Sequence, residues 1–126
     1  MVRILIYFVL PLSLYACGDA QSDVDAQPVT IVEGFMAESA ALARGQAIFE
    51  GSCASFCHAM EPEEGLDAAF LFDCKWRHGS SDQEIFDVVT NGITGTRMVG
   101  FGSNFPEGDD DLWKVIAYLR SKQQAC

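Results

Sequence analysis

The stretch Cys53-Ala54-Ser55-Phe56-Cys57-His58 contains two thiols separated by three residues, with an imidazole directly after the second thiol. This arrangement is typical of covalent haem attachment, in which two cysteines bond to one edge of the macrocycle and the next histidine lies beneath the iron. The usual motif has two residues between the cysteines, so the third residue is a departure. Taken alone, the stretch also fits a local disulfide or half of a zinc site. Features elsewhere in the chain are needed to distinguish haem attachment from a disulfide or a zinc site.

The first 16 residues have the pattern of a secretory signal peptide. Arg3 precedes an apolar run that extends to residue 16 and is shorter than the roughly 20 residues of a membrane-spanning helix. We therefore expect export across a membrane. Leu14-Tyr15-Ala16-Cys17 resembles a bacterial lipoprotein box, which makes Cys17 a candidate for lipidation and membrane attachment. Ordinary cleavage after Ala20, which would discard Cys17, is the alternative.

The length and the charge of the chain restrict its organisation and its partners. A chain of 126 residues forms one domain with a modest core, which we expect over residues 37–126. Residues 17–36 are polar and acidic without a helical period, so we expect a tether there, and the alternative is that its apolar patch, residues 29–32, lies against the domain. The net charge of −10 argues against a nucleic-acid partner, because phosphate binding needs a basic face. The carboxylates favour a partner with a basic docking face.

Three segments of the domain are expected to be helical. Residues 37–50 favour helix, and Gly51 is expected to end it before the cysteine pair. The stretch Ser81-Asp82-Gln83-Glu84 is a capping box, so a second helix should run from residue 82 to 91 and end at Gly92. A third helix should begin at Asp109, where acidic residues precede an apolar stripe. These three segments predict an all-α domain.

Met98 lies in the glycine-rich stretch Gly92–Gly102, far along the chain from His58. Glycines let a backbone pass close to a flat cofactor, so the Met98 sulfur is a candidate distal ligand. The other three methionines are less suited, because they lie in the signal segment, in the tether or two residues from His58 (Met1, Met36 and Met60). A gap-filling role for Met98 and a sixth ligand from His78 stay open.

The segment Cys74-Lys75-Trp76-Arg77-His78-Gly79 contains two candidate donors to haem propionates. The indole N–H of Trp76 and the guanidinium of Arg77 both suit carboxylates, although a packed Trp beside an exposed Arg fits equally well. Cys74 and Cys126 remain once the other cysteines are assigned, and in an oxidising compartment they are a disulfide candidate. A buried Cys74 with a free Cys126 is the alternative.

Residues 37–122 resemble the small bacterial monohaem class I cytochromes c with His/Met ligation. The resemblance is carried by four features in order: a helix with Gly45 and Phe49, CASFCH with its variant spacing, GITGTRMVGFG, and the closing helix DDDLWKVIAYLRS. It implies the all-α cytochrome c fold, with three to four helices around one covalently bound haem c. It also implies that the first and last helices cross at Gly45, near Tyr118.

Carried over to this sequence, the resemblance implies that Cys53 and Cys57 form the thioethers and that His58 and Met98 bind the iron from opposite sides. Such an iron has no open position, which implies an electron carrier rather than an enzyme. The expected role is periplasmic electron transfer between a dehydrogenase, an oxidase or another respiratory complex and a terminal acceptor. Two alternatives remain: a haem sensor or peroxidase-like enzyme with a displaceable Met98, and a haem-free binding module stabilised by zinc or a disulfide.

Overall fold

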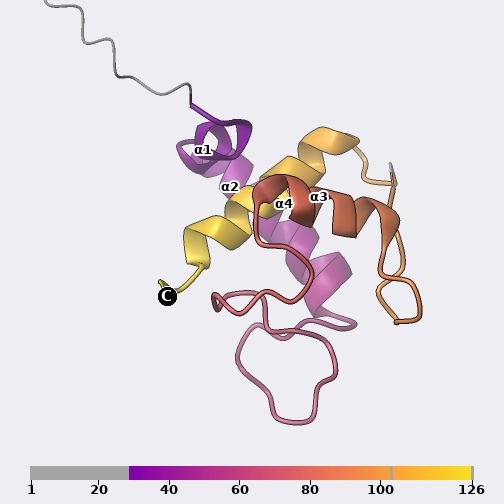
Figure 1. Cartoon of the computed structure of the whole chain (residues 1–126). Coiled ribbons are helices and arrows are strands. Elements are labelled where there is room, and N and C mark those ends of the chain that lie inside the picture. Colours follow the sequence, from indigo (N-terminus) through magenta and orange to yellow (C-terminus); the bar gives the residue numbers. More distant parts are fainter. Residues whose placement is uncertain (1–28, 103, 126) are drawn as a thin grey trace, which may run out of the picture.

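The computed structural model describes residues 29–102 and 104–125, so the expected signal peptide, Cys17 and most of the expected tether lie outside the described residues. The elements are α1 (Ile31–Met36), α2 (Ser39–Ile48), the π-helix η1 (Phe49–Ala54), α3 (Asp82–Asn91) and α4 (Asp109–Lys122) (Figure 1). Within the described ranges there is no strand, only one antiparallel bridge between Gly92 and Val99. The expected all-α fold is confirmed. None of the helices in this part of the chain is long and apolar enough to cross a membrane.

Helix α1 lies in the segment that the sequence predicts to be a tether. Its first turn is closed by a capping box, in which the Thr30 hydroxyl accepts from the Glu33 amide and the Glu33 carboxylate accepts from the Thr30 amide at 2.8 Å. Val32 is buried in a core cluster that includes residues of α4. The folded part therefore begins before residue 37. A helix of six residues is too short to show a period, and the signal that could have predicted it is the capping-box pattern Thr30-Ile31-Val32-Glu33.

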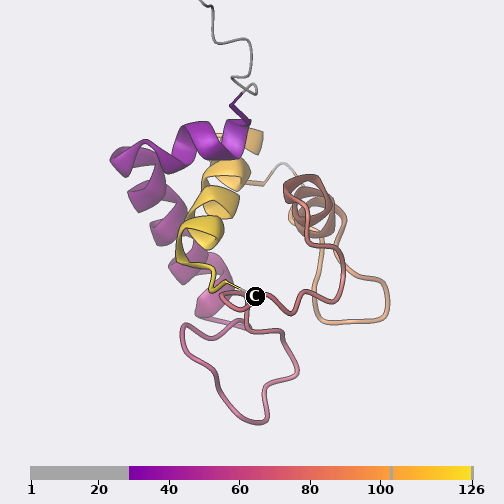
Figure 2. The same ribbon diagram turned by 60° about the vertical axis from the view of Figure 1, so that its left-hand side comes forward.

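Helices α2 and α4 cross each other (Figures 1 and 2). Their backbones meet at Gly45. A Cβ atom at Gly45 would lie 2.1 Å from the Lys114 carbonyl oxygen and 3.1 Å from the Val115 nitrogen, so the two backbones are in contact. The resemblance places this crossing near Tyr118, which lies about one turn further along α4. The Tyr118 ring instead packs against Phe49, with the ring centroids 5.9 Å apart.

An ion pair between a buried carboxylate and a partly exposed guanidinium joins the same two helices. Asp111, on α4, has a completely buried side chain. Arg44, on α2, donates to its two carboxylate oxygens, each at 2.9 Å. The backbone amide of Glu107 donates to the same carboxylate at 2.9 Å. The charge of Asp111 is thereby balanced where water does not reach it.

Helices α3 and α4 begin where the sequence predicts, whereas the expected helix over residues 37–50 begins at Ser39 and differs most at Gly51. There the chain continues in the wider turns of η1 as far as Ala54, so the expected stop at Gly51 is wrong. A glycine can remain in a helix when the packing of its neighbours stabilises it, and Phe49 is buried in this turn. Helix α3 has the expected bounds, with the Ser81–Glu84 capping box and a φ of 73° at Gly92.

Helix α3 lies on the other side of α4 from α1 and α2 (Figure 2). It packs on α4, since the Phe86 ring stacks on the Trp113 ring with the centroids 4.4 Å apart. Two long connections, residues 55–81 and 92–108, link these parts of the domain. The functional site lies between α3, α4 and these connections.

Candidate functional site

A cavity of about 540 Å³ lies between α3, α4, the end of η1 and the two long connections. Its volume is in the range of pockets that bind cofactors. Apolar walls come from Ile85, Val88 and Val89 of α3 and from Val115 and Leu119 of α4. All six residues predicted to bind haem line this cavity: Cys53, Cys57, His58, Trp76, Arg77 and Met98. The fold therefore brings together candidates that are up to 45 residues apart in sequence (98 − 53).

The three residues between the thiols are accommodated by a wide turn. Cys53 lies in η1, whose hydrogen bonds span one residue more than those of an α-helix. The amides of Cys57 and His58 both donate to the Cys53 carbonyl at 3.0 Å, so this winding continues through the motif. The additional bulk points outward, since Phe56 is 77% exposed. Both thiols can therefore line one cavity despite the unusual spacing.

The two thiols are free, and burial raises the pKa of Cys53 to about 11, with a smaller contribution from Cys57. The Cys53 thiol is thus protonated at neutral pH. No disulfide joins Cys53 to Cys57 in the structure. The described residues contain no group of three or more His, Cys, Asp or Glu side chains placed to hold a metal ion.

The His58 ring is oriented by a backbone carbonyl. Its Nδ1 atom lies 2.8 Å from the carbonyl oxygen of Ala69. Because a carbonyl only accepts, Nδ1 carries the proton, and Nε2 keeps the lone pair that can bind a metal. An outer partner of this kind fixes the tautomer and the orientation of a ligating imidazole. The sequence contains no signal for this contact, because every residue has a backbone carbonyl.

Met98 is held by bonds within its own loop. The Ile93 amide donates to the Met98 carbonyl at 2.8 Å, and the Met98 amide donates to the Thr96 hydroxyl at 3.1 Å. The glycines close the base of this loop, since a Cβ at Gly92 would lie 2.5 Å from the Gly100 nitrogen. These glycines therefore let two stretches of backbone meet, and close passage of this loop beside the cofactor stays a prediction. The only feature of the sequence that indicates this role of Thr96 is that its hydroxyl lies two residues before Met98.

Trp76 and Arg77 differ in how they are engaged. The Trp76 indole N–H donates to the Asp73 carbonyl at 3.0 Å, and the Arg120 guanidinium lies 5.5 Å from the centre of its ring. The indole N–H of Trp76 is already hydrogen-bonded within the protein, so Arg77 remains as the predicted donor to the haem propionates. Arg77 is exposed at the cavity and makes no hydrogen bond or ion pair within the described part of the chain. Lys75, which no sequence pattern indicated as a haem-binding residue, also lines the cavity.

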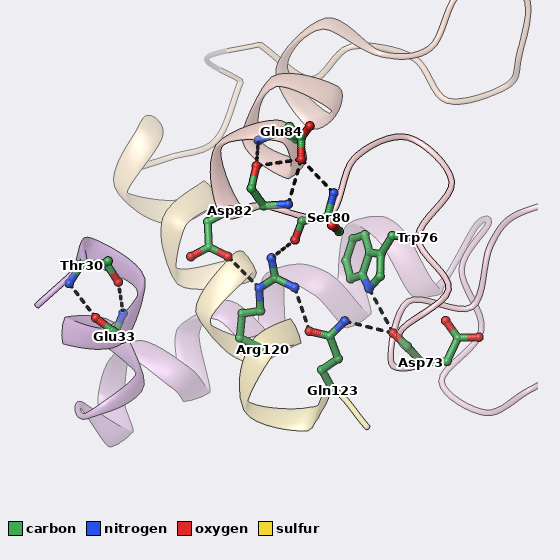
Figure 3. Close-up of polar contacts among 10 residues, drawn as sticks. Thr30, Glu33, Asp73, Trp76, Ser80, Asp82, Glu84, Arg120 and Gln123 are labelled. Atoms are coloured by element: carbon green, nitrogen blue, oxygen red, sulfur yellow. Dashed lines mark hydrogen bonds and ion pairs between the residues drawn. The ribbon is translucent and has the colours of Figure 1, made fainter. Parts of the chain in front are cut away.

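Arg120 fixes both ends of the segment that carries Arg77 (Figure 3). From α4 it donates to the Asp82 carboxylate at 2.6 Å and to the Ser80 carbonyl. It also donates to the Gln123 side chain at 2.7 Å, which in turn donates to the Asp73 carbonyl at 3.1 Å. These contacts join residues up to 50 positions apart in sequence and hold one wall of the cavity against α4.

The remaining predicted side chains lie around this wall. Cys74 is disulfide-bonded. Its predicted partner, Cys126, lies outside the described residues, and the pairing of these two cysteines stays a prediction. His78 is exposed and lines the same cavity, so both candidates for the sixth ligand face one space.

One ion pair at the cavity was not expected from the sequence. The Arg97 guanidinium lies 2.5 Å from an Asp67 carboxylate oxygen, and both residues line the cavity. The hydrogen bond from Arg97 holds the pKa of the Asp67 carboxyl below its usual value. Thirty residues separate the two side chains, and no local pattern in the sequence connects them.

These residues fit a covalently bound haem. Two free thiols, an oriented imidazole and a thioether share a cavity with apolar walls, and uncommitted cationic groups lie at its edge. The fold and this set of side chains define a monohaem c-type cytochrome, which binds haem c covalently.

The chain belongs to the family described as cytochrome c oxidase, cbb3-type, subunit III, whose model matches residues 40–119. The match covers more than half of the chain and includes every predicted haem residue. It establishes a role in haem-based electron transfer. No match was found among curated proteins or among solved structures.

Proposed function

We propose that the protein is a periplasmic one-electron carrier with His58 and Met98 as the axial ligands of its haem. The observation that carries this proposal is the meeting of both thiols, His58 and Met98 in one apolar cavity. When bound, haem c supplies a reversible one-electron couple. A pair of axial ligands leaves no open position for a substrate, which favours electron exchange over catalysis at the iron.

Each group of the chain has a defined task in this role. Cys53 and Cys57 bond to the macrocycle, and the Ala69 carbonyl keeps Nε2 of His58 available as a ligand. The Met98 sulfur favours the reduced iron and raises the potential. The apolar side chains of α3 and α4 exclude water, while Arg77 and Lys75 are suited to pair with propionates.

The axial ligands can be tested by spectroscopy. We expect low-spin ferric haem with a sulfur charge-transfer band, and we expect Met98→Ala to abolish the band while the covalent haem remains. Met60→Ala is the matched control, because Met60 lies outside the cavity lining. An open, high-spin iron in the unsubstituted protein would instead favour the sensor or peroxidase-like alternative. Matured protein without covalent haem on a denaturing gel would favour the haem-free binding module.

We further propose that the partner belongs to a respiratory complex and docks with a basic face. The family description supports such a complex. Glu61, Glu63 and Glu64 are exposed and make no ion pair within the described ranges. Phe56 and Val99, 77% and 66% exposed, add apolar surface at the edge of the cavity. Charge of one sign beside an apolar patch suits a transient partner of opposite charge.

The docking proposal predicts a salt-dependent rate. Changing Glu61, Glu63 and Glu64 to glutamine should slow electron transfer to a basic redox protein at low ionic strength and flatten the dependence on salt. Glu38→Gln combined with Asp109→Asn and Asp110→Asn removes the same charge from the N-terminal ends of α2 and α4 and serves as the control. Equal rates for the two triple variants would contradict the proposed docking face.

The proposals that the protein is exported and that it is attached to a membrane through Cys17 rest on the signal-peptide and lipoprotein-box patterns of residues 1–17. Mass spectrometry of the mature N-terminus provides the test. A lipidated Cys17 as the first residue is the expected result. A chain that begins at Gln21 without lipid would support a freely diffusing carrier instead.

A further inference from the structure

The ion pair between Asp67 and Arg97 joins the two loops that carry the axial ligands. Asp67 lies on the connection that follows His58, and Arg97 directly precedes Met98. Their side chains meet at 2.5 Å, and both residues line the cavity. The contact therefore links the connection that carries His58 to the loop that carries Met98.

The Met98 loop has few other attachments. Apart from that contact, the hydrogen bonds made by residues 93–98 lie within the loop. The loop is attached at its base, where the amides of Phe101 and Gly102 donate to the Val89 and Thr90 carbonyls of α3 at 2.8 and 3.0 Å. In the part of the chain that the structure describes, the Asp67–Arg97 pair is the one ion pair made by residues 93–98. Val99 next to this loop is 66% exposed, so packing adds little support there.

We propose that Asp67 is a positioning residue for Met98: through Arg97 it holds the distal loop in place and slows the release of the sulfur from the iron. This inference rests on the proposed axial ligands. Both side chains are largely exposed, at 71% and 66%, so the restraint is modest and is screened by salt. Loss of this ion pair should therefore affect the position of the Met98 loop and leave the free energy of unfolding of the whole domain unchanged.

The test follows the binding of imidazole to the ferric holoprotein, which requires Met98 to leave. At low ionic strength Asp67→Asn should accelerate binding by roughly two- to fivefold, the range that an exposed ion pair supplies. In 1 M salt the unsubstituted protein should approach the variant, because the screening length falls to about 3 Å. Glu63→Gln removes the same charge from the same connection without breaking an ion pair, and it should leave the rate unchanged.

A charge swap separates positioning from a general loss of structure. The double variant Asp67→Arg with Arg97→Asp should restore slow binding, and the unfolding midpoint of Asp67→Asn should match that of the unsubstituted protein. If the sulfur band is present and Asp67→Asn binds imidazole at low salt as slowly as the unsubstituted protein does, the positioning role of Asp67 is overturned and the proposed axial ligands are not. Equal acceleration by Glu63→Gln would do the same. Absence of the sulfur band from the unsubstituted protein would overturn the axial ligands and this inference together.

Discussion

Gly45 of α2 and Lys114 of α4 meet backbone to backbone: a Cβ atom on Gly45 would lie 2.1 Å from the Lys114 carbonyl oxygen. The Lys114 carbonyl belongs to a helix whose apolar side is buried, so it cannot move away without disturbing the core. The crossing of these helices therefore depends on the absence of one methyl group.

Gly45→Ala should destabilise the domain by about 1–3 kcal/mol, since a methyl group forced into a close-packed contact shifts the backbone. Urea unfolding of the holoprotein measures the effect. Gly34→Ala is the matched control in α1, where a Cβ atom would meet nothing within 4 Å. That control should gain about 0.5–1 kcal/mol, because alanine restricts the unfolded chain and favours helix. Equal effects at the two glycines would contradict the close contact.

Asp111→Asn should cost about 2 kcal/mol at neutral pH, less than for a fully buried pair because Arg44 is partly exposed. The hydrogen bond from Arg44 is the main cause that lowers the pKa of Asp111 in the folded protein below its ordinary 3.8. The ionised carboxylate thus stabilises the fold fully above pH 3.8, and this contribution is lost as the pH falls through the lower folded pKa. The difference in unfolding free energy between the two proteins should therefore shrink in acid.

The exposed Asp109, in the same turn of α4, provides the control for this effect. Asp109→Asn changes the charge at the helix N-terminus without touching Arg44. A pH dependence equal to that of Asp111→Asn would show that the helix dipole, and not the buried pair, is responsible.

Phe49 and Phe56 lie seven residues apart and should respond in opposite ways to truncation. Phe49 is buried against Phe72 and Tyr118, so Phe49→Ala should cost about 3–5 kcal/mol. Phe56 points outward, so Phe56→Ala should change the unfolding free energy by less than about 0.5 kcal/mol and leave the yield of covalent haem unchanged. A large loss of stability or of haem at Phe56 would contradict the outward turn of the attachment stretch.

The disulfide at Cys74 predicts the thiol count of the mature holoprotein. With Cys53 and Cys57 in thioethers and Cys74 paired, the unreduced, denatured protein should show no free thiol at these three positions. Peptide mapping should link the peptide of Cys74 to that of Cys126. Cys74→Ser should lower stability by about 4 kcal/mol, the value for a long closed loop. A free thiol at Cys126 would contradict the predicted pairing.

Local chemistry was readable from the sequence alone. The thiols and imidazole of CASFCH predicted the haem, the positions of the methionines left Met98 as the candidate, and the Ser81–Glu84 box placed the start of α3. These signals are legible because attachment, capping and helical period depend on residues only a few positions apart.

Only the tertiary structure decided how distant parts meet. The contact of the Ala69 carbonyl with His58, the use of the Trp76 indole by Asp73 and the wide turn through Cys53 leave no pattern in the sequence. Backbone carbonyls look alike along a chain, and Asp67 meets Arg97 only because the tertiary structure brings two long connections together. The crossing at Gly45 likewise depends on close packing between residues far apart in sequence, and it fixes α4, which forms one wall of the cavity.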